Sequence, residues 1–406
     1  MASGRDGIRR ITISVQAVVR LFLVLMIVPV PATAQAIAPA TGDVALSQLD
    51  YADIEGWRDA DHAGAFAAFQ ASCRKLLENP PHVRRLGLAV DDLLSVCRAA
   101  LAQPGALGGA AAQAFFENRF HPVTIEDSAG ERQGFFTGYF EPAVAASRVR
   151  SDQFPIPLYR RPANLVQTKD RELPPSWNPD FAFAELGPDG LRPYADRAAI
   201  EAGHLEGRGL ELAFVESWIE AFFIHVQGSA RLRFADGSLM RVAFAAKNGH
   251  PYQSIARLLI EAGRIEKASM TMPALRQWLV DHPQAGLALM RRNPSFIFFR
   301  EAEDLRAEDG PVGAAAVPLR PGISLAVDRT WHLFGTPIFI DVPALDPQTW
   351  RGRRGLMIAQ DTGSAIVGPT RADIFIGTGD AAGAEAGVIK HGGRFVILWP
   401  KPAAGR

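Results

Sequence analysis

The stretch "AQDTGSAIVGPTRADIF", from Ala359 to Phe375, places two aspartates in apolar sequence of strand-like character. Asp361 follows "GLMIAQ" and Asp373 precedes "IFIGTG", and both runs are typical of buried β-strands. A carboxylate inside such a strand costs free energy unless a partner or a proton neutralises it. The stretch therefore predicts a strand-rich C-terminal part of the chain and a site where carboxylates do chemistry.

The strand-like pattern extends outward from this stretch. It recurs in "PSFIFFRE" (294–301), "GTPIFIDVP" (335–343) and "RFVILWP" (394–400), and earlier in "GERQGFFTGYFEP" (130–142). Between the early and late strands we predict a Pro- and Gly-rich loop (150–210), a helix (211–226), a hairpin turning at Asp236-Gly237 (229–247) and helices from 252 to about Arg292. Residues 40–118 are predicted to be helical. This order indicates one β domain with a second domain inserted into it.

The N-terminus has the three parts of a secretory signal peptide. "GRDGIRR" (4–10) is basic, "LFLVLMIVPVPA" (21–32) is apolar, and small-residue cleavage patterns end at Ala34 and Ala36. The apolar run is short for a membrane span, although an uncleaved anchor stays an alternative. No cysteine lies near the cleavage site, so a lipid anchor is not expected. We expect export to the periplasm and leave an association with the outer membrane open.

Composition and cysteines set further limits. The 406 residues are 48% hydrophobic and 21% charged, as in a globular protein. Forty-three basic residues balance 43 acidic ones, which argues against nucleic acid as a partner. The two cysteines, Cys73 and Cys97, lie in predicted helices, where they form either a disulfide or two buried thiols.

Three aspartates in the β segments are candidates for acid–base chemistry: Asp328, Asp361 and Asp373. A glycosidase needs a carboxylic acid that protonates the departing glycosidic oxygen. Asp373 has apolar neighbours along the chain, and burial among such side chains would raise its pKa and keep the proton in place. The alternative for each aspartate is a structural one, in which it accepts backbone hydrogen bonds in a Gly-rich turn.

Amide, hydroxyl and aromatic side chains near glycines suit sugar binding. They are found in "TGYFEP", "HVQGSARL" and "AAKNGHPYQSI", and each suits a turn or a core equally well. Glu141, in the first of these segments, is a further carboxylate that a site could use. Metal-dependent, serine-hydrolase and nucleotide chemistry find no support, because the sequence lacks HExxH and CxxC, GxSxG, and phosphate-loop motifs, respectively.

Together these segments resemble the membrane-bound lytic murein transglycosylase A family. The resemblance covers roughly residues 120–400 and rests on motifs in one order, among them "TGYFEP", "FPIPLYRRP", "VQGSARLRFADGS", "AAKNGHPYQSIARLLIEAGRI", "AVPLRPGISLAVDRT" and "AQDTGSAIVGPTRADIFIGTG". The final part is similar to the three-aspartate (3D) domain, whose aspartates match Asp328, Asp361 and Asp373.

The resemblance implies a mainly β fold with α, in which a double-psi β-barrel carries an inserted, β-rich domain and a helical N-terminal segment. The parts are then a signal peptide (1–36), a helical segment with the first part of the barrel (40–142), an inserted substrate-binding domain (143–292) and the second part of the barrel (293–400).

The resemblance also implies a reaction, namely non-hydrolytic cleavage of the β-1,4 bond between N-acetylmuramic acid and N-acetylglucosamine, leaving a 1,6-anhydromuramoyl end. Asp373 takes the role of acid and base, Asp361 assists it, and Asp328 is structural or supporting. The expected sugar-binding residues are Thr137, Gly138, Tyr139, Gln227, Gly228, Ser229, Lys247 and Asn248.

We expect peptidoglycan glycan strands as the partner, no metal or organic cofactor, and a monomer. Protein partners in cell-wall synthesis or division stay open. Two other functions compete: a hydrolytic glycosidase on a similar barrel, and a peptidoglycan-binding protein without activity. The presence of Asp373 argues against the second.

Overall fold

The structure is a computed structural model that describes residues 36–37, 44–127, 133–169, 171, 173–174, 177, 181–303, 305–306, 308–345 and 354–403. Met1–Ala34 and Gln35–Arg406 separate into two units, and all described residues belong to the second. The predicted signal peptide lies outside the described residues except for Ala36. Among these residues, no helix has the length and apolar character needed to cross a membrane.

Three helices follow the first strands: α1 (His62–Glu78), α2 (Val90–Leu101) and α3 (Gly109–Arg119). Short 3₁₀ turns, η1 (Tyr51–Asp53) and η2 (Trp57–Asp59), precede them. The expectation that 40–118 is helical throughout is wrong at its start, because Val44–Gln48 forms strand β2. Its first residues alternate buried and exposed, which fits a half-buried strand better than a helix.

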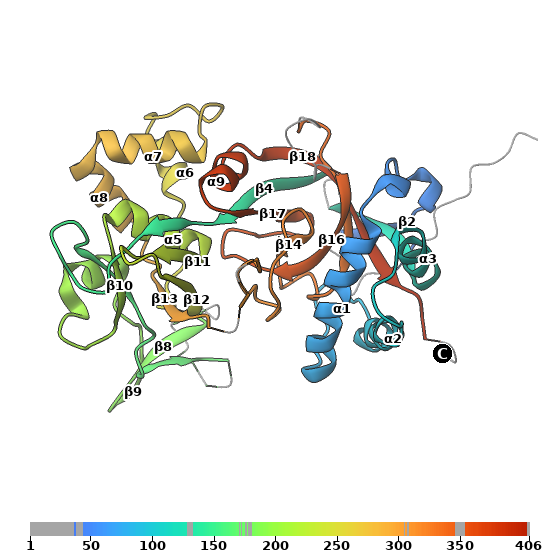
Figure 1. The fold of residues 1–406 in the computed structure, drawn as a ribbon, viewed down its shortest axis with the longest axis horizontal. Coiled ribbons are helices and arrows are strands. Elements are labelled where there is room, and N and C mark those ends of the chain that lie inside the picture. The colour runs from blue at the N-terminus through green and yellow to red at the C-terminus, as the bar shows by residue number, and fades with distance from the viewer. Residues whose placement is uncertain are drawn as a thin grey trace, which may run out of the picture. The chain divides into compact units, whose positions relative to one another are not determined.

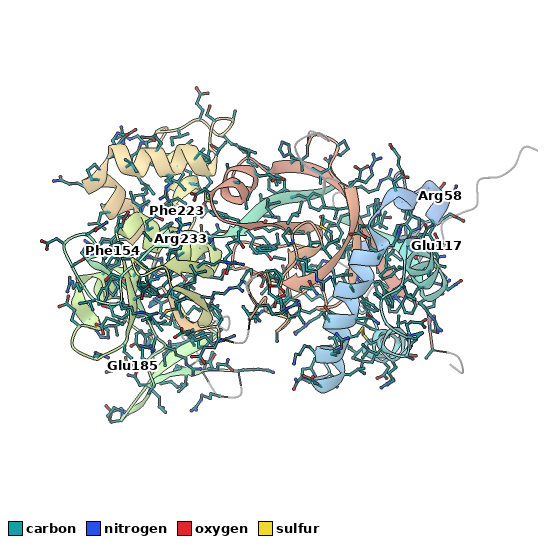
Figure 2. All side chains as sticks on the ribbon, in the orientation of Figure 1. Arg58, Glu117, Phe154, Glu185, Phe223 and Arg233 are labelled. Carbon is teal, nitrogen blue, oxygen red and sulfur yellow. A yellow bond between two sulfur atoms is a disulfide. The ribbon has the colours of Figure 1, made fainter. Side chains whose placement is uncertain are left out.

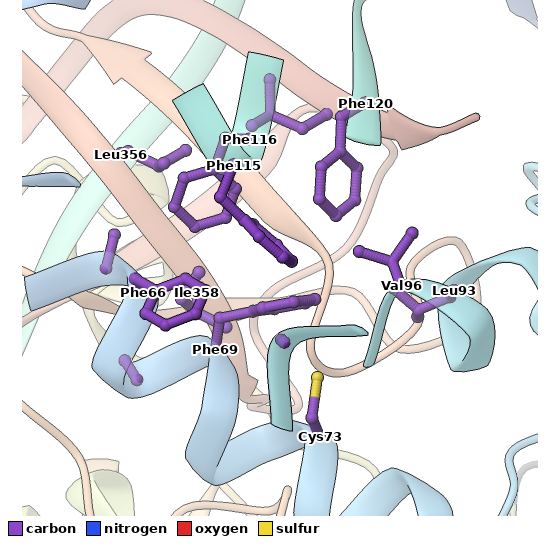
Figure 3. Packing of buried hydrophobic residues seen from close by; sticks show 14 of the residues in the cluster. Phe66, Phe69, Cys73, Leu93, Val96, Phe115, Phe116, Phe120, Leu356 and Ile358 are labelled. Atoms are coloured by element: carbon purple, nitrogen blue, oxygen red, sulfur yellow. The ribbon is translucent and has the colours of Figure 1, made fainter. Parts of the chain in front are cut away.

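The helices pack their aromatic side chains into one core, which Figure 3 shows from close by. Phe66 and Phe69 of α1 meet Phe115 and Phe116 of α3, with ring centroids 4.9–6.5 Å apart. Strand residues Leu356 and Ile358 complete this core, so the helices are fixed to the sheet behind them.

A disulfide joins Cys73 of α1 to Cys97 of α2, and their Cα atoms lie 5.0 Å apart. Both cysteines are fully buried in the same core. The bond closes a loop that contains the whole turn between the two helices.

The largest sheet has nine strands from both ends of the described chain. They are β1 (Ala36–Ile37), β2, β3 (Phe120–Asp127), β4 (Gln133–Glu141), β14 (Ser324–Val327), β15 (Pro337–Asp341), β16 (Arg354–Asp361), β17 (Arg371–Thr378) and β18 (Lys390–Pro400). The pairings run β4–β17–β14–β16–β15–β18 and return from β18 to β4, so these strands form a closed ring (Figure 1). Closure leaves no free edge among them. Helix α9 (Asp380–Ala386) follows β17.

The middle of the chain forms three smaller sheets. One has four strands, β5 (Ala143–Ala145), β11 (Ser229–Arg233), β12 (Leu239–Lys247) and β13 (Ile297–Glu301). The others pair β6 (Ile156–Tyr159) with β10 (Glu211–Val215), and join β7 (Leu165–Gln167), β8 (Phe183–Gly187) and β9 (Gly190–Arg192). The helical elements are α4 (Arg197–Ala199), η3 (Ile200–His204), α5 (Trp218–Gln227), α6 (Ile255–Glu261), α7 (Met272–Asp281) and α8 (Pro283–Arg291). Figure 2 draws the side chains on the ribbon and labels Glu185 of β8, the partner of Arg192 at 2.9 Å.

Three expectations for this region need correction. The loop expected over 150–210 contains strands β6, β7, β8 and β9, and several of its residues are buried in a core cluster. The helix expected over 211–226 is instead strand β10 followed by α5, which Ser217 caps by accepting from the Glu220 N–H. Strand β13 was expected in the barrel but pairs with β12. An apolar strand pattern does not tell which sheet a strand joins, because that depends on long-range pairing. The expected hairpin is confirmed, since β11 and β12 pair across Gly237, whose φ is 81°.

Candidate active site

The candidate acids lie in one row across neighbouring strands of the ring. Asp361 of β16 pairs with Ala326 of β14, and Ala326 pairs on its other side with Asp373 of β17. Asp373 pairs in turn with Thr137 of β4. Paired residues project to the same face of a sheet, so the two carboxylates stand on one face with only the small Ala326 between them. Strand pairing, and not sequence proximity, creates this site.

Asp373 has a polar and charged environment. Its Oδ1 lies 2.6 Å from Nη1 of Arg371 and also accepts a short hydrogen bond from the Thr137 hydroxyl. Thr137 accepts from Nη2 of Arg371 at 2.7 Å. The expectation that apolar side chains surround this carboxyl is wrong. Alternation along β17 turns the adjacent Ala372 and Ile374 into the core, whereas Asp373 keeps 19% of its side chain exposed.

Asp361, unlike Asp373, accepts hydrogen bonds at both carboxyl oxygens. Its Oδ1 accepts from the Ala314 N–H at 2.9 Å and its Oδ2 from the Tyr139 hydroxyl at 3.0 Å. Burial raises the pKa of Asp361; these hydrogen bonds oppose the shift and the charge of Asp373 adds to it. Burial, followed by the two aspartates, raises the pKa of Tyr139 well above its ordinary value, so its hydroxyl stays a donor.

Asp328 follows β14, and its carboxylate accepts hydrogen bonds from groups of a turn and a loop. It accepts from the Thr330 N–H at 2.9 Å, the Thr330 hydroxyl at 2.7 Å and the Gly368 N–H at 2.8 Å. These bonds tie the turn after β14 to the loop before β17, which is the structural alternative considered for each aspartate.

Gly138 lies between Thr137 and Tyr139 and allows a close helix contact. A Cβ at this position would lie 2.8 Å from Cα of Ala386 in α9. The absence of a side chain therefore lets α9 pack against β4 at the site.

Gln227, Gly228 and Ser229 connect α5 to β11. Gln227 ends the helix, and its Oε1 accepts from the Phe140 N–H of β4 at 3.0 Å. Gly228 caps the helix with a φ of 78°, a conformation that favours glycine. Ser229 begins β11 and is 7% exposed. The Gln227 bond fixes this turn beside the strand that carries Thr137 and Tyr139.

Lys247 and Asn248 lie at the end of β12. The Asn248 side chain is fully buried; it donates to the carbonyls of Ala195 and Pro294, both at 2.9 Å, and accepts from the Phe296 N–H at 2.9 Å. Its amide is thus used in holding loops together, which favours a supporting role over direct sugar contact. Lys247 pairs in the ladder with Ile297 of β13.

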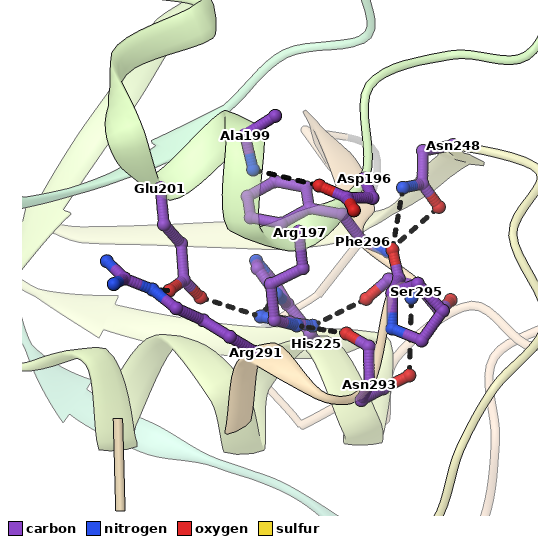
Figure 4. A network of polar contacts seen from close by, with 11 residues as sticks. Asp196, Arg197, Ala199, Glu201, His225, Asn248, Arg291, Asn293, Ser295 and Phe296 are labelled. Carbon is purple, nitrogen blue, oxygen red and sulfur yellow. Dashed lines mark hydrogen bonds and ion pairs between the residues drawn. The ribbon is translucent and has the colours of Figure 1, made fainter. Parts of the chain in front are cut away.

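A buried polar network that the sequence did not indicate supports these loops (Figure 4). Arg197 donates to the carbonyls of Asn293 and Ser295 at 3.1 and 2.7 Å, and it pairs with Glu201, which Arg291 also contacts at 2.9 Å. Burial lowers the pKa of Arg197 to about 10, and Glu201 opposes that shift.

Arg371 and Ala326 were also missed by sequence reasoning. The sequence spacing could have indicated Arg371, because residues two apart in a strand share a face and Arg371 precedes Asp373 by two positions. Ala326 had none, since its position depends on strand register. Among the described residues, no group of three or more His, Cys, Asp or Glu side chains could hold a metal ion.

Two protein-family models and several solved structures match this chain. A family model of the MltA specific insert domain matches residues 135–300, and one of the 3D domain matches residues 323–399. The crystal structure of a membrane-bound lytic murein transglycosylase from Agrobacterium tumefaciens is 38% identical, with a TM-score of 0.80 over 87% of this chain and 97% of that one. The chain belongs to the membrane-bound lytic murein transglycosylase A family.

Two further relatives of the lytic murein transglycosylase A family are similar to this chain. The Vibrio cholerae protein of that name is 35% identical over 272 residues, which are 65% of this chain and 66% of the relative. The Escherichia coli MltA structure with bound chitohexaose is 28% identical, with a TM-score of 0.63 over 90% of this chain and 96% of that one. The chain thus spans just under two thirds of the Vibrio protein in sequence but nearly all of the solved relatives in structure.

Proposed function

We propose that this chain is a lytic transglycosylase that cleaves the β-1,4 bond between N-acetylmuramic acid and N-acetylglucosamine in peptidoglycan. Family membership and the chitohexaose bound to the E. coli relative support this activity and a glycan as the substrate. The observation that carries this proposal is the difference between the two carboxyl oxygens of Asp373. Its Oδ1 is bonded, whereas Oδ2 has no hydrogen-bond partner among the described residues, and the side chain is partly exposed.

Asp373 acts first as acid and then as base. Its proton passes to the glycosidic oxygen, and the bond from C1 of muramic acid to that oxygen breaks. The C6 hydroxyl of the same sugar then bonds to C1 and returns its proton to the Asp373 carboxylate. No water is consumed, so the product carries a 1,6-anhydro ring and no new reducing end.

A single carboxylate suffices because the nucleophile is part of the substrate. A hydrolase normally uses a second carboxylate to activate water or to form a covalent intermediate. A tethered hydroxyl removes that need, since intramolecular reaction supplies about 7–11 kcal/mol of the barrier in favourable cases.

Asp361 is the supporting carboxylate. Both of its oxygens already accept hydrogen bonds, so neither is directed at a substrate. Burial raises the pKa of Asp361, and the nearby charge of Asp373 adds to that shift.

The proposed sugar-binding surface combines residues of β4, in the nine-stranded sheet, with residues of the middle segment. Thr137, Gly138 and Tyr139 supply it from β4, and Gln227, Gly228, Ser229, Lys247 and Asn248 from the middle segment. The bond from the Phe140 N–H to Gln227 supports this grouping. Asn248 contributes by holding its loop.

The ring of strands is a double-psi β-barrel with an inserted domain. Two parallel pairings, β14–β16 and β17–β4, within an otherwise antiparallel ring support this topology. The pairing of β5 and β13 within the four-stranded sheet extends the insert from 143 to about Glu301.

The protein acts in the periplasm as a monomer, without metal or organic cofactor. The predicted N-terminal signal peptide and the relatives named as murein transglycosylases support this location. Cell-wall synthesis or division proteins are candidate partners.

Mass spectrometry of products from purified peptidoglycan tests this function, comparing the wild type with Asp373→Asn, Asp361→Asn and the exposed control Asp281→Asn. We expect anhydromuropeptides from the wild type and the control, and a loss of about 10²–10⁴-fold for Asp373→Asn with glycan binding retained. Asp361→Asn should lose less.

Other outcomes assign other functions. Reducing-end muropeptides would make the protein a hydrolase. Binding without any product from the wild type would make it a binding protein. An active Asp373→Asn variant would transfer the acid role to Asp361.

A further inference from the structure

The Arg371 side chain contacts two polar side chains of the candidate site, Asp373 and Thr137. It lies in β17, two residues before Asp373, and its side chain is 16% exposed. One guanidinium nitrogen contacts Asp373 Oδ1 at 2.6 Å, and another donates to Thr137 Oγ1 at 2.7 Å. Because the Thr137 hydroxyl also donates to Asp373 Oδ1, the three side chains form a closed triangle.

The guanidinium is itself held in place. Its Cζ lies 5.3 Å from the ring centroid of Phe135, which pairs with Arg371 in the neighbouring strand. Nη1 also donates to the Ala372 carbonyl. A planar fork fixed on two sides has little freedom, so it can orient the groups that it contacts.

This triangle makes the two oxygens of Asp373 different from one another. An aspartate carboxyl rotates easily about its last torsion, and its oxygens are otherwise equivalent. Here Oδ1 is taken by Arg371 and Thr137, whereas Oδ2 has no such partner among the described residues. Oδ2 is therefore the Asp373 oxygen that these contacts leave open.

We propose that Arg371 is a positioning residue that, through Asp373 Oδ1 and Thr137, directs Asp373 Oδ2 toward the glycosidic oxygen in the acid step. Its positive charge also stabilises the carboxylate that forms when Asp373 gives up its proton. This role rests on the proposed transglycosylase activity.

Other polar groups near Asp373 do not provide this orientation. Tyr139 donates to Asp361, and Asp361 accepts its bonds from Tyr139 and Ala314. Lys390 pairs with Thr137 in the ladder, but its amino group donates to the carbonyls of Lys267 and Met270. Arg371 is thus the cation that contacts the candidate acid among the described residues.

Kinetics with two leaving groups test the proposal. Arg371→Met removes the fork and keeps the stem, Arg371→Lys keeps the charge without the fork, and Arg394→Met is a matched control on an exposed arginine of β18. The substrates are a muramic acid–glucosamine oligosaccharide and an aryl glycoside of muramic acid, whose phenolate leaves without a proton.

For Arg371→Met we expect kcat on the oligosaccharide to fall about 10²-fold with KM unchanged, and to fall less than about tenfold on the aryl glycoside. Arg371→Lys should recover part of the loss, and Arg394→Met should match the wild type. A rise in KM at constant kcat would overturn the proposal in favour of substrate binding. Equal losses on both substrates would also overturn it, because they indicate a structural defect.

A crystal structure of Arg371→Met separates this inference from the function itself. We expect the Asp373 carboxyl to leave its wild-type orientation in a correctly folded chain. An unchanged carboxyl would overturn the positioning role. Absence of anhydro products from the wild type would refute the transglycosylase activity instead, and the crystal structure would still decide whether Arg371 orients Asp373.

Discussion

Asp361 and Asp373 differ in how many of their oxygens the protein already uses. Both oxygens of Asp361 accept hydrogen bonds, and burial raises its pKa. Asp373 has contacts to Oδ1 only and is partly exposed. A proton donor must reach its substrate, so availability of an oxygen decides between the two residues more directly than burial does.

His332 is a buried histidine that should make the free energy of unfolding depend on pH. It is 2% exposed, and its Nε2 donates to the Pro369 carbonyl at 2.7 Å. Burial lowers the pKa of His332 from 6.5 to about 4. Below pH 6.5 the unfolded chain binds a proton that the folded chain does not, so the free energy of unfolding falls as pH drops toward 4.

We expect the free energy of unfolding of the wild type, relative to His332→Gln, to decrease by on the order of 3 kcal/mol between pH 7 and pH 4. Urea unfolding at several pH values measures this difference. Glutamine keeps a donor for Pro369 and cannot titrate. The same replacement at exposed His82 is the control, and an equal pH dependence of the two variants would contradict the prediction.

At the scale of elements, the site depends on the contact between β4 and α9. Gly138 permits that contact, because a Cβ there would meet Ala386 Cα at 2.8 Å and the Ala386 carbonyl at 3.0 Å. Backbone atoms cannot move aside as a flexible side chain can. The strand that carries Thr137 and Tyr139 would have to shift instead.

Gly138→Ala should therefore lower the free energy of unfolding by about 1–3 kcal/mol. Its matched control is Gly355→Ala in β16, where a Cβ meets no atom within 4 Å. That control should be neutral or slightly stabilising, since alanine restricts the unfolded chain. Thermal unfolding of both variants measures the difference, and similar melting temperatures would refute the packing argument.

At the scale of the whole described molecule, Glu141 connects the nine-stranded sheet to the four-stranded one. It ends β4, is 1% exposed, and accepts from Arg231 of β11 at 2.7 Å and from Arg241 of β12 at 3.4 Å. Thr378 of β17 donates to it at 2.8 Å. The carboxylate that sequence reasoning left available for catalysis is thus fully used in joining two sheets.

Glu141→Ala should lower the free energy of unfolding by about 3–5 kcal/mol, because it leaves two guanidinium groups without their buried partner. Glu78→Gln, which breaks an exposed ion pair with Lys75 on α1, should change it by less than about 0.5 kcal/mol. Urea unfolding compares the two. A loss below about 1 kcal/mol for Glu141→Ala would show that the junction does not depend on this cluster.

The sequence alone determined many local elements and the family. Short apolar runs predicted β15, β16, β17 and β18, and Asp236-Gly237 predicted its hairpin, because these signals depend only on neighbouring residues. Ordered motifs identified the family, and two aspartates in strand-like sequence indicated an acid. The strand at 44–48 was missed because its apolar pattern is short.

Only the tertiary structure decided which groups each polar residue contacts. Register places Asp361 and Asp373 on either side of Ala326, and pairing of β17 with β4 brings Arg371 and Thr137 to Asp373 Oδ1. It also fixes Glu141 between two arginines and buries Asn248 among backbone groups. Such contacts join residues far apart in the chain, and strand register, which local sequence does not encode, determines them.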